Sequence, residues 1–291
     1  MIGPGRRAQL ASLLEVMAPK PGNVHRSRDL PDLTFFDFLA SATAIGEALD
    51  STRLVGIGRA VERAVIETQK VVATNTNLGI ILLLAPMAAV PDGIDLREGL
   101  QSVLGTTTIE DARAVYRAIR LAHPGGMGTV SDQDIADEPT LPLREVMAMA
   151  ADRDLVARQY ADGYREVLDE ALPAIASTLR SGWPVETAVV AAHLNLLAKH
   201  PDSLIARKAG LDRAREVSHR AEAILSAGWP NRPEAARLCA EFDDWLRHPD
   251  RRFNPGTTAD LVTAALYAAL RDGTIPVPVP SHRAGGSIDE V

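Results

Sequence analysis

The stretch Thr257–Gly273, TTADLVTAALYAALRDG, is apolar on nearly all sides when it is wound into a helix. A helix without a polar face is buried on all sides, so other elements must surround it. Gly273 is the residue type that commonly ends helices. The stretch therefore predicts a buried helix that ends at Gly273, with the rest of the fold packed around it.

Other segments show the apolar stripe of helices with one buried face. In TTIEDARAVYRAIRLA, Thr108 and Asp111 have the spacing of a capping box before such a stripe. The three clearest stripes are Ile109, Ala112, Val115, Ile119 and Ala122; Val156, Tyr160, Tyr164, Val167 and Ala171; and Leu211, Ala214, Val217, Ala221 and Ile224. No segment alternates convincingly as a strand does. We therefore predict an all-α protein with a single globular domain of about ten to twelve helices.

The loops are marked by proline and glycine, and no linker divides the body of the chain. We expect a catalytic domain over residues 1–273. Residues 274–291 lack a periodic apolar face, which predicts a flexible tail. Cys239, the only cysteine, occupies an apolar helical position and is expected to pack in the core.

Composition narrows the classes of partner. The formal charge is −7 and no long basic run occurs, which argues against nucleic acid but allows small phosphorylated substrates. The longest apolar run, Leu78–Val90, is too short to cross about 30 Å of hydrocarbon, so no membrane association is expected. The single cysteine and the amphipathic N-terminal segment indicate a cytoplasmic protein. A homodimer is left open.

The loop PKPGNVH, Pro19–His25, follows the first helical segment. The two prolines favour an extended backbone at Lys20, which would present a cation. Gly22 permits a sharp turn, and Asn23 and His25 add groups that could bind a substrate. The alternative is a helix stop with solvated polar residues.

TNTNLGIILLLA places two asparagines before a strongly apolar helix. Asn77 could cap this helix, or Asn75 and Asn77 could border an anion site at its N-terminus. The loop His123–Pro142 is long and combines glycines with acidic residues, among them Asp134. These carboxylates could hold Mg²⁺, or the loop could simply be a mobile acidic one.

Two further stretches carry candidate groups. In DSLIARKAG, Arg207 and Lys208 could clamp phosphates or interact with the end of their helix. In NPGTTADL, Asn254 precedes the buried helix, and Asp260 lies in its first turn. Asp260 could complete a capping box with Thr257, or it could serve as a metal ligand or base.

In this order, EVMAPKPGNV, TNTNLGI, TTIEDARAVYRAIRLAHPGGMG, PDSLIARKAG and NPGTTADL resemble the triphosphoribosyl-dephospho-CoA synthase family. The resemblance covers most of the chain, roughly Ser12–Arg271. It implies a transferase that moves the triphosphoribosyl group of ATP to the 2′-hydroxyl of 3′-dephospho-CoA and releases adenine. The product is the prosthetic-group precursor of citrate lyase or malonate decarboxylase.

The resemblance also implies roles for the residues on these motifs. The expected catalytic residues are Asp111, Asp134 and Asp260, with Asp134 and Asp260 as ligands of Mg²⁺. The expected substrate-binding residues are Lys20, Gly22, Asn23, His25, Asn75, Asn77, Arg207, Lys208 and Asn254. ATP is the expected substrate, and which carboxylate acts as the base is left open.

Two motifs depart from the citrate-lyase members of the family. Asn23, Val24 and His25 stand where those members read Leu-Val-Asp, and Asn77-Leu78 replaces a His-Lys pair. The chain resembles a divergent branch carried by archaea, methylotrophs and related bacteria. One alternative is therefore phosphoribosyl transfer in the biosynthesis of a one-carbon, methanopterin-type coenzyme. Another is a non-catalytic helical protein that binds nucleotides or serves as a scaffold.

Overall fold

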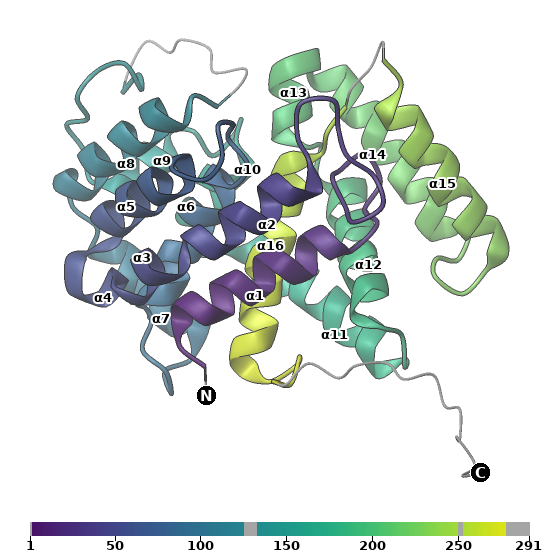
Figure 1. Cartoon of the computed structure of the whole chain (residues 1–291), viewed down its shortest axis with the longest axis horizontal. Helices are drawn as coiled ribbons and strands as arrows, with labels where there is room; N and C mark the ends of the chain where they lie inside the picture. Colours follow the sequence, from purple (N-terminus) through teal and green to yellow (C-terminus); the bar gives the residue numbers. More distant parts are fainter. Residues whose placement is uncertain (1, 125–132, 250–252, 278–291) are drawn as a thin grey trace.

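The computed structural model describes residues 2–124, 133–249 and 253–277 of the chain. Within these ranges the protein has sixteen α-helices, one π-helical segment and no strand, which confirms the predicted all-α fold (Figure 1). The number of helices exceeds the expected ten to twelve because short helices such as α3 (Gly46–Asp50) and α4 (Thr52–Val55) stand alone. No helix in the described part is long and apolar enough to cross a membrane.

The predicted buried helix is α16 (Gly256–Asp272), which runs through the middle of the molecule (Figure 1). Residues 257–259 and 261–270 are buried, as the lack of a polar face predicts. The helix ends where expected, because Gly273 adopts a left-handed conformation with φ of 84°. The helices that pack against it include α1 (Pro4–Met17), α6 (Leu78–Ala89), α11 (Leu172–Arg180) and α12 (Val185–Lys199).

The first half of the chain forms one side of the molecule (Figure 1). There α5 (Ile57–Gln69) packs along α8 (Ile109–Ala122). The N-terminus of α8 has the predicted capping box between Thr108 and Asp111. Most of the predicted α8 stripe is buried or half-buried, which explains this pairing. The other helices of this side that have not been bounded are α2 (Phe35–Ala44), α7 (Leu96–Gly105) and α9 (Leu143–Ala148).

The second half of the chain supplies the other side. Here α12 packs against α14, and α14 packs against α15 (Figure 1). Cys239 is buried in α15, as its apolar helical position predicted. The helices not yet bounded are α10 (Leu155–Asp162), α13 (Ser203–Ala209), α14 (Leu211–Ser226) and α15 (Pro233–Arg247).

The segment from Val156 to Ala171 corrects one prediction. Its apolar stripe suggested a continuous helix, but α10 stops at Asp162, and both Gly163 and Tyr164 have positive φ. The chain then resumes as a π-helix over Glu166–Ala171, which leads directly into α11. All five stripe residues are buried despite the break. The stripe therefore predicted burial correctly and helix continuity wrongly.

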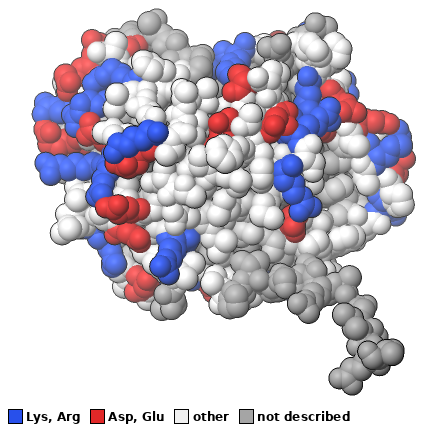
Figure 2. All heavy atoms as spheres, viewed as in Figure 1, with Lys and Arg blue, Asp and Glu red and all other residues white. Residues whose placement is uncertain are grey.

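Charged side chains of both signs are interspersed on the face shown in Figure 2. They gather on the two flanks, and a largely uncharged band lies between them over α1 and α2. This face has no continuous basic surface of the kind that binds a polyanion. The boundary expected at residue 273 stays a prediction, and residues 278–291 of the expected tail lie outside the described residues.

Candidate functional site

A cavity of about 700 Å³ lies beside the N-terminal ends of α6 and α16. We call it the main cavity. Its wall includes residues from motifs that are far apart in the sequence. Eight of the sequence-predicted site residues line it: Asn23, Asn75, Asn77, Asp134, Arg207, Lys208, Asn254 and Asp260. Lys20, Gly22, His25 and Asp111 are not among its lining residues.

The two asparagines before α6 make different hydrogen bonds from those predicted. The Asn75 carboxamide oxygen accepts a hydrogen bond from the backbone N–H of Leu78 at 3.1 Å, so Asn75 covers the start of the helix. Asn77, expected as the cap, makes no side-chain capping bond. Its amide nitrogen donates instead to the hydroxyl of Thr68 at 3.1 Å, because the side chain is buried against α5.

Asp260 lies near the N-terminal end of α16, just after its first turn, and lines the main cavity. Burial raises the pKa of its carboxyl group well above the usual value, and the carboxylates of Glu15, Asp202 and Asp154 raise it further. The Arg207 guanidinium acts in the opposite direction. A carboxyl group with a raised pKa next to a cavity is suited to accept a proton near neutral pH.

The predicted capping box between Thr257 and Asp260 is wrong. The cap comes from Asp202, whose carboxylate accepts hydrogen bonds at 2.8 Å from both the N–H and the hydroxyl of Thr258. The same carboxylate accepts from the N–H groups of Leu204 and Ile205 at the start of α13. Asp202 therefore ties the N-termini of two helices together and leaves Asp260 facing the cavity.

The cationic part of the wall comes from the end of α13. Arg207 forms an ion pair with Asp154, the residue that caps α10. Lys208 is exposed and makes no ion pair within the described ranges. Both residues line the main cavity and bring positive charge to its wall.

The PKPGNVH loop lies differently from the prediction. The expectation that Lys20 presents a cation is wrong, because its side chain is 0 % exposed. Its ammonium lies 3.0 Å from the Glu15 carboxylate and donates to the Glu15 carbonyl at 2.6 Å and the Ala18 carbonyl at 3.2 Å. Burial lowers the pKa of Lys20 and raises that of Glu15, although each charge partly offsets the shift of the other. Glu15, not Lys20, reaches the main cavity.

The rest of this loop is anchored to the second half of the chain. Gly22, with φ of 74°, donates its N–H to Asp243 of α15 at 2.7 Å. A β-carbon there would meet Leu246 at 2.7 Å, so the close approach requires glycine. His25 is buried, and its pKa is lowered to about 4 by burial and by Arg247. Of the loop residues expected to bind substrate, only Asn23 lines the cavity.

Two more expected carboxylates differ in position. Asp111 belongs to the capping box of α8, accepts a hydrogen bond from the N–H of Gly58 at 2.8 Å, and does not line the main cavity with the other two expected catalytic residues. Asp134 lines the main cavity and accepts from the N–H of Ala136 at 2.9 Å. Residues 125–132 of the long loop lie outside the described residues.

The donor set is compatible with Mg²⁺ in one way. Among the described residues no group of three or more His, Cys, Asp or Glu side chains is placed to hold a metal ion. Single carboxylates, including those of Asp134 and Asp260, nevertheless line the cavity. Mg²⁺ is commonly held by one or two carboxylates together with waters and substrate phosphates, so this wall fits an ion that arrives with a nucleotide.

Sequence reasoning missed three carboxylates of this wall, those of Glu15, Asp32 and Asp154. Glu15 looked like an interruption of an apolar helical face, but a charged residue at such a position was itself the signal of a buried polar partner. Asp154 precedes α10 and has the sequence appearance of an ordinary N-cap. Only the fold reveals that it also pairs with Arg207 at the cavity.

A comparison with protein families identifies the family of the chain. The family model described as ATP:dephospho-CoA triphosphoribosyl transferase matches residues 3–276, which include every helix of the fold. The chain belongs to this family. It is thereby a member of a family of transferases, as the sequence motifs predicted.

Individual relatives agree with the ATP:dephospho-CoA triphosphoribosyl transferase family. A Vibrio cholerae protein described as "Probable 2-(5''-triphosphoribosyl)-3'-dephosphocoenzyme-A synthase" is 27% identical over 279 residues, 89% of this chain and 85% of the relative. A solved structure described as "Crystal structure of putative triphosphoribosyl-dephospho-coA synthase from Archaeoglobus fulgidus" is 28% identical with a TM-score of 0.62. It covers 81% of this chain and 99% of its own.

Proposed function

We propose that this transferase moves the triphosphoribosyl group of ATP to the 2′-hydroxyl of 3′-dephospho-CoA and releases adenine. The family to which the chain belongs carries this donor and this acceptor in its description. The observation that carries the proposal is the convergence of Asn75, Asp134, Arg207 and Asp260, from four separate motifs, on one cavity. Separate surface positions would not support a common site.

The polar and charged residues of the cavity have different proposed roles. Arg207 and Lys208 would neutralise the triphosphate of ATP, and Asn254 and Asn23 lie on the same wall as donors and acceptors for the substrates. The buried carboxamide oxygen of Asn254 has no hydrogen-bond partner in the described part, so a substrate group could satisfy it. Mg²⁺ would be held by Asp134 and the phosphates, and when bound it would neutralise part of their charge.

The proton transfer is assigned to Asp260. In the reaction the bond between C1′ of ATP and N9 of adenine breaks, and a bond forms between C1′ and the 2′-oxygen of the acceptor. The acceptor hydroxyl loses its proton to Asp260, and the departing adenine takes up one proton. Of the two roles expected for Asp260, we assign the base, because burial raises the pKa of its carboxyl group and makes the ionised form a stronger proton acceptor.

The test combines purified protein, ATP, 3′-dephospho-CoA and Mg²⁺, and follows adenine by chromatography. We expect adenine release that requires the acceptor, and a loss of roughly 10²- to 10⁴-fold in kcat for Asp260→Asn. Release of pyrophosphate from phosphoribosyl pyrophosphate with a pterin-pathway acceptor would favour the one-carbon alternative. Absence of turnover with either donor would favour the non-catalytic alternative.

Two further expectations belong to this proposal. A cytoplasmic location would give the enzyme access to ATP and to dephospho-CoA. A homodimer would be consistent with the uncharged band over α1 and α2, where Phe36 is 73% exposed. Light scattering on the purified chain would measure its mass and test the second expectation.

A further inference from the structure

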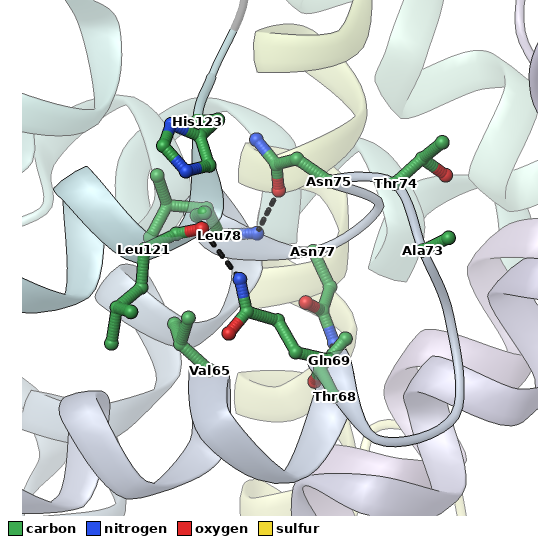
Figure 3. Close-up of a pocket in the computed structure, with 11 residues that line it drawn as sticks. Val65, Thr68, Gln69, Ala73, Thr74, Asn75, Asn77, Leu78, Leu121 and His123 are labelled. Carbon is green, nitrogen blue, oxygen red and sulfur yellow. Dashed lines mark hydrogen bonds between the residues drawn. The ribbon is translucent and has the colours of Figure 1, made fainter.

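A smaller pocket of about 300 Å³ opens beside the main cavity. We call it the side pocket. Figure 3 shows its wall, which comes from the end of α5, the loop that precedes α6 and the end of α8. The proposed roles of the main cavity leave this pocket without a ligand.

The two spaces share part of their lining. Thr74, Asn75, Asn77, Leu78 and His123 line both the main cavity and the side pocket. A ligand that lies across this shared rim would contact both. The side pocket is therefore positioned to take one part of a substrate whose other part occupies the main cavity.

The two spaces differ sharply in charge. None of the eleven residues that line the side pocket is Asp, Glu, Lys or Arg. The main cavity, in contrast, is lined by eight: Glu15, Asp32, Asp134, Arg153, Asp154, Arg207, Lys208 and Asp260. Phosphates and a metal ion are stabilised by side chains of opposite charge, which the main cavity supplies. The uncharged side pocket is better suited to a neutral group.

Two amide groups of the side pocket are oriented by their own hydrogen bonds. Asn75 uses its oxygen to accept from Leu78 N–H, which leaves its NH₂ as a donor without a partner in the described part (Figure 3). Gln69 uses its NH₂ to donate to the carbonyl of Leu121, which leaves its oxygen as an acceptor (Figure 3). The pocket thus offers one fixed donor and one fixed acceptor, with the apolar side chains of Val65, Leu78 and Leu121 on the same wall.

We propose that the side pocket binds the adenine base of a substrate. The apolar side chains would contact the faces of the ring. The exocyclic amino group would donate to the Gln69 oxygen, and a ring nitrogen would accept from the Asn75 NH₂; these are the two kinds of hydrogen bond that a single amide side chain makes with N6 and N7 of adenine. A 6-oxopurine presents an acceptor where adenine presents the amino group, so it would face the Gln69 oxygen unfavourably.

This inference rests on the proposed function, and both of its substrates contain adenine. The base could belong to ATP, in which case it leaves as the product, or to dephospho-CoA. The binding chemistry is the same in both cases, and the experiment separates them.

The test measures binding of ATP, ITP, tripolyphosphate and 3′-dephospho-CoA to the full chain by calorimetry. The variants are Gln69→Leu, which removes the acceptor, and Asn75→Asp, which keeps the oxygen that accepts from Leu78 but removes the donor. Gln101→Leu is the matched control, because Gln101 is exposed on α7 and lines neither space. For Gln69→Leu we expect roughly tenfold weaker binding of the adenine compound that uses the pocket. Tripolyphosphate binding should stay unchanged in this variant.

Each outcome has a defined meaning. Weaker ATP binding and a smaller preference for ATP over ITP would assign the base of ATP, and weaker dephospho-CoA binding alone would assign that of the acceptor. Asn75→Asp also adds a negative charge, and the loss of tripolyphosphate affinity measures the effect of that charge. The loss of affinity for the adenine compound must be larger than this. Unchanged binding of both adenine compounds in Gln69→Leu, or an equal loss in Gln101→Leu, would overturn the inference.

The same experiment keeps the inference separate from the proposed function. If adenine is released but both variants bind ATP and dephospho-CoA as the wild type does, the function stands and the adenine pocket fails. If no acceptor supports adenine release but Gln69→Leu still weakens ATP relative to tripolyphosphate, the pocket stands and the transfer reaction fails.

Discussion

The carboxylate of Asp260 lies directly against Gly79, so close that a β-carbon on residue 79 would come within 2.6 Å of its Cγ atom. Gly79 belongs to the first turn of α6, and Asp260 follows the first turn of α16. The missing side chain lets the two helix starts meet at the cavity. Gly79 therefore determines where the proposed base can lie.

The substitution Gly79→Ala should displace Asp260. Alanine is the better helix former by about 1 kcal/mol, so propensity alone predicts a more stable protein. The overlap with the carboxylate should reverse this sign and cost about 1–3 kcal/mol of the free energy of unfolding. Because a shift of about 1 Å in a catalytic group can cost roughly 10²-fold in rate, adenine release should fall by that order. Urea unfolding and the adenine assay measure the two effects.

Gly105→Ala is the matched control for this prediction. Gly105 also lies in a helix, the last residue of α7, but a β-carbon there meets nothing within 4 Å. This variant should keep its activity and remain within about 1 kcal/mol of the wild type in stability. Wild-type activity and raised stability in Gly79→Ala would contradict the assigned position of Asp260.

The buried pair of Glu15 and Lys20 predicts a strong dependence of stability on both partners. Lys20→Met leaves the Glu15 carboxylate buried without its cation and should cost about 3–5 kcal/mol of unfolding free energy. The double variant Glu15→Gln with Lys20→Met should recover most of this loss, because neither charge remains. Urea titrations of the three proteins measure the free energies.

An exposed ion pair provides the comparison. Lys70 and Glu67 lie 2.7 Å apart on the surface, and Lys70→Met should cost less than about 1 kcal/mol. Equal losses in Lys20→Met and Lys70→Met would show that the buried pair has no special weight in the fold.

We predict that Lys208 contributes to the binding of phosphates and not to the stability of the fold. It is an exposed cation on the wall of the main cavity, so Lys208→Met should leave stability nearly unchanged. The lost charge-assisted hydrogen bond should weaken binding of both ATP and tripolyphosphate by roughly tenfold or more. Calorimetry at two salt concentrations measures this, and Lys70→Met again serves as the control. A loss of affinity for ATP but not for tripolyphosphate would show that Lys208 does not bind the phosphates.

Acid should destabilise the protein partly through His193, which is fully buried in α12. Burial and the nearby Lys20 lower its pKa from 6.5 to about 3. Between these values the unfolded chain binds a proton that the folded chain does not, so stability falls as pH drops below about 6.5. His193→Leu should therefore remove part of the acid sensitivity.

The measurement is the urea midpoint at pH 7.5 and at pH 5. The wild type should lose more stability between these values than His193→Leu does, by up to a few kcal/mol. The exposed His219 of α14 gives the control His219→Leu, which should behave as the wild type. Equal acid sensitivity in all three proteins would refute the assignment to His193.

Helical periodicity predicted those parts of the fold that depend on one helix and its burial. The capping box of α8 and the end of α16 at Gly273 are local features, and both are confirmed. The break at Tyr164 is not local. The tyrosine hydroxyl donates to the Leu83 carbonyl of α6 at 2.8 Å, and its ring is fully buried. A distant contact therefore accompanies a backbone conformation that the local pattern did not predict.

The candidate site divides in the same way. The motifs identified eight residues that the fold brings to one cavity, because each motif marks a loop or one end of a helix. They did not reveal which member of a local pair faces that cavity. Glu15 and Lys20 are five positions apart, and packing against the rest of the chain decides that the carboxylate reaches the wall. Likewise Asp202 takes over the cap that Asp260 could have formed with Thr257.

The central position of α16 has a consequence for biosynthesis. The ribosome makes this helix after every element that surrounds it, so α1, α6 and α12 emerge before their common partner exists. Contacts between α1 and α16 join the two extremes of the described chain, and such long-range contacts slow folding. Until α16 is released, the apolar faces that it will cover remain open to aggregation or to chaperones. The nascent polypeptide can therefore complete this core only after α16 has left the ribosome.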